Sequence, residues 1–171
     1  LSKFYSLPNR IKNEHTEEAH EKLPLVEIYS FAFMPNHYHF LLKQLQDKGI
    51  ARFISDVQNS FAKNFNIVND RNGSLFQSGF KSRRIAYEED FYHISRYIHL
   101  NPVTSNIIKF NELLDYPYTS LSMYSNTNLN KFINVEYLFN HFRNLSSYVK
   151  FLENKVEYQQ KLKRIKDLLL D

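Results

Sequence analysis

Two histidines separated by a single residue lie in the apolar stretch FMPNHYHFLL, residues 33–42. Alternate side chains of a β-strand project to the same face, so His37 and His39 would lie on one side, about 6.5–7 Å apart at the backbone. At that separation two imidazoles can bind one metal ion. Because burying two imidazoles without partners is costly, they need a ligand, hydrogen bonds or water. A half-exposed pair on a solvated strand face is the alternative that this spacing leaves open.

The composition limits which metal sites and folds are available. The chain has 171 residues, of which 43% are hydrophobic, enough for one sizeable core. It has no cysteine, so a metal would need His, carboxylate or amide ligands, and no disulfide framework is available. No apolar run reaches the roughly 18 residues of a membrane span, and no secretory signal opens the sequence. The net charge of +4 is compatible with a polyanionic partner but indicates one only weakly.

The histidines fall in a segment that predicts a β-hairpin. LVEIYSFAF (25–33) is rich in β-forming residues, Pro35 interrupts the pattern, and HYHFLLKQ (37–44) continues it. From Gly49 the pattern changes to the three- and four-residue spacing of an amphipathic helix. The apolar residues that carry this spacing are Ile50, Phe53, Ile54, Val57, Phe61 and Phe65.

The rest of the chain predicts extended structure followed by helices. SLFQSGFKSRRIAY (74–87) is expected to be extended, and a helix should start near Tyr87, where three acidic residues suit the positive end of the helix dipole. Pro102 should end this helix, because the residue before a proline avoids the α region. A loop is expected over 115–128, and two further helices between about Asn134 and Asp171, the second through EYQQKLKRIKDLLL.

Four stretches in order resemble a known family. MPNHYHFLL resembles the HUH motif (His, hydrophobic, His) of the single-tyrosine HUH transposases, and most closely that of the REP-associated tyrosine, or transposase IS200-like, branch. The other three are GSLFQSGFKS (73–82), RYIHLNPV (96–103) and DYPYTSLSMY (115–124). The resemblance spans roughly residues 25–124. Together the ordered motifs are far more specific than the histidine pair alone.

The resemblance implies a nucleophile and a metal site. The family motif of Tyr, three residues and Asn falls on Tyr97 and Asn101, which share one face of a helix. Tyr97 is the expected nucleophile, with Tyr92 as the alternative, whereas His99 should face away and be structural. The expected metal ligands are His37, His39 and Asn101. The family expectation is Mg²⁺ or Mn²⁺, although imidazoles equally accept cobalt, nickel or zinc.

Basic and aromatic residues in the middle of the chain suit a nucleic-acid strand. Cationic side chains can contact phosphates, and aromatic rings can stack on unpaired bases. A solvated basic face is the alternative for each of them. The candidate DNA-binding residues are Lys81, Arg83, Arg84, Phe76, Phe80, Arg52, Lys63 and Arg71.

The resemblance also implies a fold, a domain organisation and an activity. The expected fold is α+β, a ferredoxin-like antiparallel sheet with helices on one face. Residues 1–125 would form the HUH single-tyrosine transposase domain, and residues 126–171 a C-terminal helical extension of the same domain. Family members begin with a strand that pairs in the centre of the sheet; we expect it to lie upstream of Leu1 or to be missing from the sheet.

The implied reaction is metal-dependent cleavage and rejoining of single-stranded DNA near hairpins, through a 5′-phosphotyrosine intermediate. The expected partner is single-stranded or hairpin DNA, with no membrane, in a cytoplasmic, nucleoid-associated monomer or homodimer. Two other functions remain open: a non-catalytic relative that binds single-stranded nucleic acid, and a metal-dependent nuclease that uses water in place of tyrosine.

Overall fold

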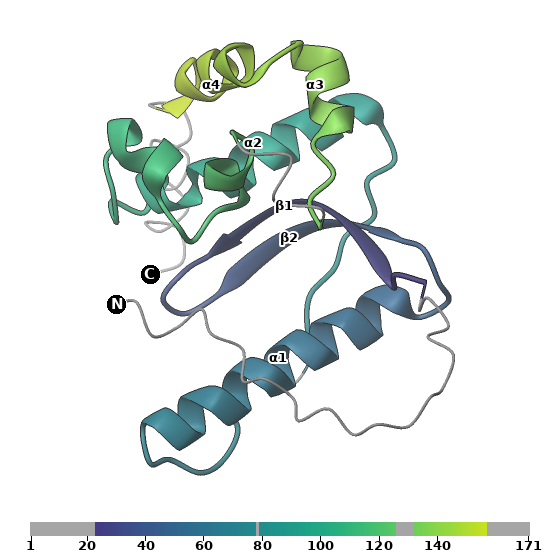
Figure 1. The fold of residues 1–171 in the computed structure, drawn as a ribbon, viewed down its shortest axis with the longest axis vertical. Helices are drawn as coiled ribbons and strands as arrows, with labels where there is room; N and C mark the ends of the chain where they lie inside the picture. The colour runs from purple at the N-terminus through teal and green to yellow at the C-terminus, as the bar shows by residue number, and fades with distance from the viewer. Residues whose placement is uncertain (1–22, 78, 126–131, 157–171) are drawn as a thin grey trace, which may run out of the picture.

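The computed structural model describes residues 23–77, 79–125 and 132–156, which form an α+β fold (Figure 1). This confirms the predicted fold class. The elements in chain order are β1 (Val26–Phe33), β2 (Tyr38–Gln44), α1 (Gly49–Val68), α2 (Glu88–Thr104), the 3₁₀ helices η2 (Phe110–Asp115) and η3 (Ser120–Met123), α3 (Glu136–Phe142) and α4 (Leu145–Glu153).

β1 and β2 form the predicted antiparallel hairpin. The turn is closed by the backbone N–H of Met34, which donates to the carbonyl of His37 at 2.8 Å. The register places His39 opposite Ala32, and an irregularity between Ile28 and Ser30 shifts the pairing by one residue. A bulge of this kind changes which face the following side chains take. The small Ala32 is therefore the cross-strand neighbour of a histidine.

The two edges of the hairpin have different neighbours. Along the outer edge of β1, the N–H of Phe33 donates to the carbonyl of Tyr118, and the N–H of Asn134 donates to the carbonyl of Ile28, both at 2.8 Å. Among the described residues, β1 is the one strand that pairs with β2. The additional strand that the family resemblance predicts would precede residue 23, where the described residues begin. Its presence therefore stays a prediction.

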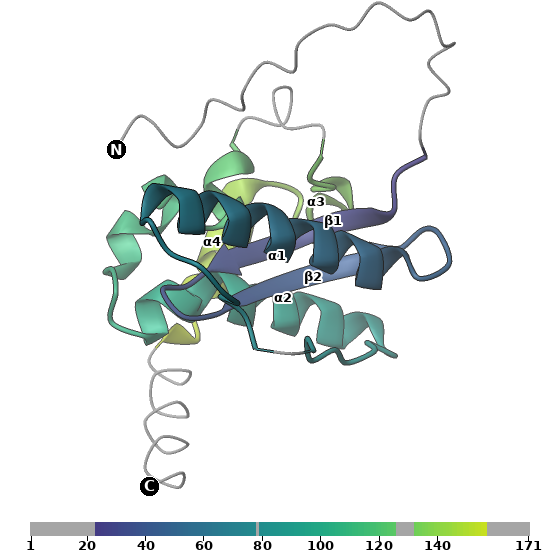
Figure 2. The same ribbon diagram turned by 90° about the horizontal axis from the view of Figure 1, so that it is seen from below.

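Helices cover both faces of the hairpin, not one face as expected (Figures 1 and 2). On one face Phe40 packs edge-on against Phe53 of α1, with ring centroids 5.5 Å apart. On the other, Tyr29 packs edge-on against Phe91 of α2 at 4.9 Å. The expectation was wrong because both faces of the hairpin carry large apolar side chains, and each must be buried against a helix.

The α2 side contains most of the core. Side chains from α2, η3, α3 and α4 meet there with essentially no exposure, among them Leu100, Leu121, Leu138 and Leu152. In α1, by contrast, Gly49 and Ile54 are the buried residues. Gly49 begins this helix beside the Leu25 carbonyl, where any Cβ would clash. The face of the hairpin that packs against α2 is therefore more closely covered than the face that packs against α1.

Two local predictions need correction. α2 does not end before Pro102 but runs to Thr104, because Pro102 is fully buried and the following N–H of Ser105 still donates to the Asn101 carbonyl at 3.0 Å. The C-terminal region contains a helix, α4, that was not separately expected, and the helix predicted through residues 157–170 lies outside the described residues.

Candidate active site

The histidine pair lies where β2 leaves the turn. His37 is exposed and His39 half-buried, and their rings are edge-on with centroids 5.0 Å apart. The His37 Nδ1 lies 2.6 Å from Asn36 Oδ1. A carboxamide oxygen can only accept, so Nδ1 donates and the lone pair of a neutral imidazole lies on Nε2. The ring therefore has a fixed orientation and one nitrogen suited to bind a metal.

Tyr97 lies on α2 next to this pair. Its side chain is 48% exposed, and its ring is edge-on to that of His39 with centroids 5.6 Å apart. The rings of His37, His39 and Tyr97 thus form a row from the hairpin turn to the helix. An exposed phenol beside two imidazoles is accessible to an external strand. Residues that lie about 60 positions apart in the sequence meet at one place.

Tyr92, the alternative nucleophile, contacts a different part of the molecule. Its ring stacks on His141 with centroids 4.0 Å apart, and its hydroxyl donates to Glu88 Oε1 at 2.8 Å. Burial and the Glu88 carboxylate raise the pKa of the Tyr92 phenol above its ordinary value, which disfavours a phenolate. Tyr97 is therefore the better placed of the two.

Asn101 lies one helical turn beyond Tyr97 and is 2% exposed. Its Nδ2 donates to the Tyr97 carbonyl at 3.1 Å, which leaves the side-chain oxygen as the atom with metal-binding chemistry. Because α2 continues past Pro102, Asn101 belongs to an ordered helical turn and not to a frayed end. Its role as the third ligand stays a prediction.

The donor atoms available here match the expected metal chemistry. In the described residues, no three His, Cys, Asp or Glu side chains come together to hold a metal ion. A metal at this place would therefore need the imidazoles of His37 and His39 and an amide oxygen such as that of Asn101. Metal–nitrogen bonds of about 2 Å are compatible with two rings at this separation. Two imidazoles and an amide oxygen are donors that can hold a divalent ion, and imidazoles accept cobalt, nickel or zinc as readily as Mg²⁺ or Mn²⁺.

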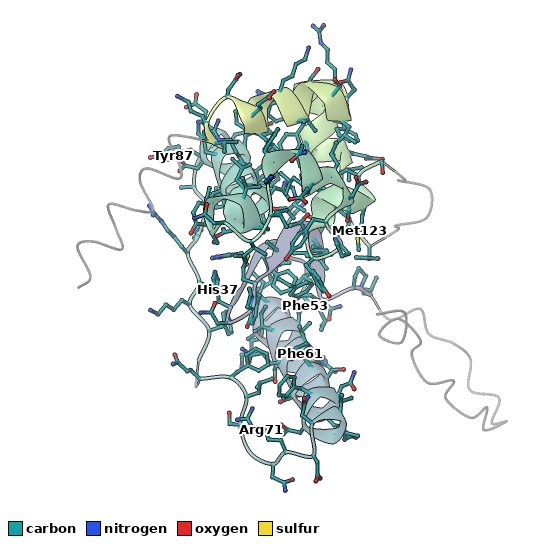
Figure 3. The ribbon with its side chains drawn as sticks, turned by 90° about the vertical axis from the view of Figure 1, so that its left-hand side faces the viewer. His37, Phe53, Phe61, Arg71, Tyr87 and Met123 are labelled. Atoms are coloured by element: carbon teal, nitrogen blue, oxygen red, sulfur yellow. The ribbon has the colours of Figure 1, made fainter. Side chains whose placement is uncertain are left out.

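The basic candidates near the site lie on the connection between α1 and α2. Lys81, Arg83 and Arg84 are all exposed. This connection runs from the region of Arg71 to Tyr87 along the side of the molecule on which His37 lies (Figure 3). The remaining basic candidates, Arg52, Lys63 and Arg71, are exposed on α1 and just after it. The geometry is compatible with a strand that passes along the connection toward the histidines.

The two aromatic candidates differ in environment. Phe76 is half-buried and lies 6.0 Å, between ring centroids, from both Tyr38 and Phe61. Phe80 is 38% exposed. Phe76 therefore contributes to packing against α1, whereas Phe80 offers a ring to solvent.

Two exposed rings were not expected among the candidates. Phe61 and Phe65 share the helical spacing that predicts burial, yet they are 55% and 36% exposed and stack on each other with centroids 6.1 Å apart. The helical period identifies an apolar face but not what covers it. In the described structure, the second half of α1 therefore presents aromatic surface.

His99 is structural, as predicted. It is fully buried, and both its ring nitrogens have hydrogen-bond partners, the Tyr148 hydroxyl and Ser120 Oγ. Burial lowers its pKa from the ordinary 6.5 to about 3, so the imidazole is neutral. The sequence carries no signal for these two partners, which lie far away along the chain.

The fold and the site together define a small α+β protein in which a hairpin histidine pair meets a tyrosine on a helix. The family model described as Transposase IS200 like matches residues 9–101, more than half of the chain, and the chain belongs to this family. Membership makes it a transposase of the IS200 class and implies that it binds DNA. Searches of curated proteins and of solved structures found no significant match. No helix in the described part is long and apolar enough to cross a membrane.

Proposed function

We propose that this chain cleaves and rejoins single-stranded DNA near hairpins, with Tyr97 as the nucleophile and a divalent metal ion as cofactor. The observation that carries the proposal is the row of His37, His39 and Tyr97, with successive ring centroids 5.0 and 5.6 Å apart. Membership of the IS200-like family supports it independently. The proposal goes beyond family membership because it specifies which DNA bond is cleaved and which residue attacks it.

In the proposed reaction the Tyr97 oxygen attacks a backbone phosphorus. The new bond joins the phenolic oxygen to the 5′-phosphate, the bond to the neighbouring 3′ oxygen breaks, and that oxygen leaves as a 3′-hydroxyl after taking up a proton. Because one phosphodiester replaces another, a later hydroxyl can attack the phosphotyrosine and rejoin a strand without an external energy source. The exposure of Tyr97 allows a strand to reach it.

The remaining site residues would orient the reactants. His37, with Nδ1 donating to Asn36, and His39 would hold Mg²⁺ or Mn²⁺ together with Asn101. When bound, such an ion would polarise the phosphate oxygens and stabilise the charge that develops during in-line displacement. Tyr97 and Asn101 share a side of α2, so the position of this helix sets the positions of both side chains.

We propose that the strand binds across the exposed cations of the α1–α2 connection. Lys81, Arg83 and Arg84 would contact phosphates and supply salt-dependent affinity, while Phe80 would stack on an unpaired base. Duplex DNA keeps its bases stacked, which favours a single strand at such a surface. Arg52, Lys63 and Arg71 would extend the contact along α1. The protein would work in the cytoplasm at the nucleoid, as a monomer or a homodimer.

A denaturing gel with end-labelled hairpin oligonucleotides and Mn²⁺ tests the proposal. The wild-type chain should cut the strand, retain the 3′ label as a covalent adduct and release the 5′-labelled fragment with a free 3′-hydroxyl. Tyr97→Phe should abolish both cleavage and adduct, because phenylalanine keeps the ring but lacks the attacking oxygen. Tyr87→Phe is the matched control: Tyr87 is an exposed tyrosine just before α2 and should be dispensable.

Two outcomes would contradict the proposal. Cleavage that survives Tyr97→Phe without any adduct would indicate a nuclease that uses water. Binding of hairpin DNA with no cleavage by the wild-type chain, in Mg²⁺ or in Mn²⁺, would indicate a non-catalytic nucleic-acid-binding protein.

A further inference from the structure

A buried polar cluster connects α2 to the strand that supports His39. Ser120 Oγ lies 2.7 Å from His99 Nε2 and accepts a hydrogen bond from the Phe31 N–H at 2.9 Å. His99 Nδ1 lies 2.8 Å from the Tyr148 hydroxyl, which is 2.7 Å from Ser95 Oγ. We call His99, Ser120, Tyr148 and Ser95 the buried cluster. Each of its members is fully buried.

One arrangement of protons satisfies every contact in the buried cluster. His99 Nε2–H donates to Ser120 Oγ, and the Ser120 hydroxyl donates to the Phe31 carbonyl at 3.4 Å. The Tyr148 hydroxyl donates to His99 Nδ1 and accepts from the Ser95 hydroxyl. This requires a neutral imidazole protonated on Nε2. A buried network in which every group is paired fixes one geometry, because any shift leaves a polar atom unsatisfied.

The buried cluster connects the two sides of the candidate active site. His99 lies two residues after Tyr97 on α2, and Phe31 lies one residue before Ala32, the cross-strand neighbour of His39. The path from the tyrosine helix to β1 thus needs two hydrogen bonds, one on each side of Ser120, and the pairing of Ala32 with His39 continues it to β2. The segment before Ser120 follows β1 as well, since Thr119 forms a bridge with Ala32.

The buried cluster gives the DYPYTSLSMY stretch a structural role. Ser120 and Tyr124 both hold β1: the Tyr124 hydroxyl donates to the Tyr29 carbonyl at 2.6 Å. Both also contact His99 of α2, Ser120 through a hydrogen bond and Tyr124 through an edge-on ring contact with centroids 5.1 Å apart. Through these hydrogen bonds the stretch can act on the site by setting the position of β1.

We propose that His99 and Ser120 are positioning residues that set the separation between the Tyr97 helix and the histidine strand. The proposal rests on the proposed function, because the separation matters only if Tyr97 and the histidines act on one phosphate. The Tyr148 hydroxyl joins α4 to α2 through Ser95 and His99, and neither of these hydrogen bonds involves β1. Loss of the Ser120 hydroxyl therefore affects the site, whereas loss of the Tyr148 hydroxyl affects stability alone.

The first test measures the separation directly and needs no activity. The chain has no cysteine, so Glu89→Cys on α2 and Lys43→Cys on β2, both exposed, would carry two spin labels specifically. Pulsed electron resonance then gives the distribution of distances between helix and strand. Ser120→Ala should broaden or shift this distribution, and Tyr148→Phe, which removes two hydrogen bonds of the same cluster, should leave it unchanged. An unchanged distribution in Ser120→Ala, or an equal change in both variants, would overturn the proposal.

The second test measures single-turnover cleavage and DNA affinity in unlabelled protein. Ser120→Ala should lose about 10- to 100-fold in cleavage rate at unchanged DNA affinity, because a misplacement of about 1 Å has an effect of that size. Tyr148→Phe should cleave within about threefold of the wild-type rate, although its unfolding midpoint should fall about as far as that of Ser120→Ala. Equal rate losses in the two variants would overturn the proposal. If the wild-type chain does not cleave at all, the proposed function fails, and the distance measurement still decides whether Ser120 fixes the helix.

If Ser120→Ala does not fold, a pair of substitutions at His99 gives the same information. His99→Gln keeps an amide N–H that can donate to Ser120, and His99→Leu removes all hydrogen bonding at similar volume. The positioning role predicts a wild-type distance distribution for His99→Gln and an altered one for His99→Leu. Identical distributions in the two variants would overturn it.

Discussion

The two faces of the hairpin are covered in different ways. On the α2 side, side chains from α2, η3, α3 and α4 are fully buried, and polar groups among them form a connected hydrogen-bond network. On the α1 side, one helix makes most of the described cover, and its second half exposes Phe61 and Phe65. The α2 side has the properties of a rigid frame, which is what precise chemistry needs. The α1 side has the exposed rings and cations that suit a flexible strand.

The largest difference between the faces should appear in stability. Leu138→Ala on the α2 side should destabilise the chain by about 2–5 kcal/mol, because Leu138 is fully buried and truncation leaves a cavity. Phe61→Ala on α1 should change the free energy of unfolding by less than about 1 kcal/mol, since more than half of its surface is already exposed. Denaturant unfolding of both variants measures this. Similar losses would show that α1 is as tightly packed as α2.

A smaller effect should follow from lowering the pH. The folded pKa of His99 is about 3 because of burial, whereas the unfolded value is the ordinary 6.5. Between these values the unfolded chain binds a proton that the folded chain does not, so stability is complete above pH 6.5 and falls as the pH drops below it. By pH 5 the loss should be about 2 kcal/mol, from about 1.4 kcal/mol per unit.

His99→Gln supplies the control for this pH dependence. Because glutamine does not titrate, the variant should be less stable at pH 7 and lose less on acidification than the wild-type chain. Urea unfolding at several pH values between 7 and 5 compares the two. Parallel stability curves for wild type and variant would show that His99 is not the group responsible.

The smallest expected effect concerns single cations on the two sides of the molecule. Lys81→Ala should lower the slope of log affinity against log salt for single-stranded DNA by about 1, the value for one lost phosphate contact. Lys150→Ala on α4 is the matched control, an exposed lysine on the α2 side whose loss should leave the slope unchanged. Titrations at several salt concentrations measure both. Equal slopes in the two variants would indicate that the DNA strand does not bind at Lys81.

The sequence predicted the parts of the fold that depend on local pattern. The hairpin followed from β-forming residues on both sides of Pro35, and α1 from its helical period. The start of α2 followed from acidic residues after Tyr87. Its end did not, because the local preference before Pro102 was outweighed by burial of that proline in the core.

The parts that the sequence could not supply depend on contacts between distant residues. The histidine pair and Tyr97 were chosen from motifs, and the structure brings these three together. The partners of His99 lie 21 and 49 residues further along the chain, and no spacing rule connects them. The helices on both faces were missed for a related reason: alternation in a strand shows that a side chain is apolar, but not which helix will cover it.

The most direct test of the central claim is to identify the residue that carries the DNA. The chain would be incubated with a hairpin oligonucleotide and Mn²⁺, digested with protease and nuclease, and its peptides sequenced by mass spectrometry. The account predicts one nucleotide-bearing peptide, modified on Tyr97. A nucleotide on another tyrosine, or cut DNA with every tyrosine unmodified, would contradict it.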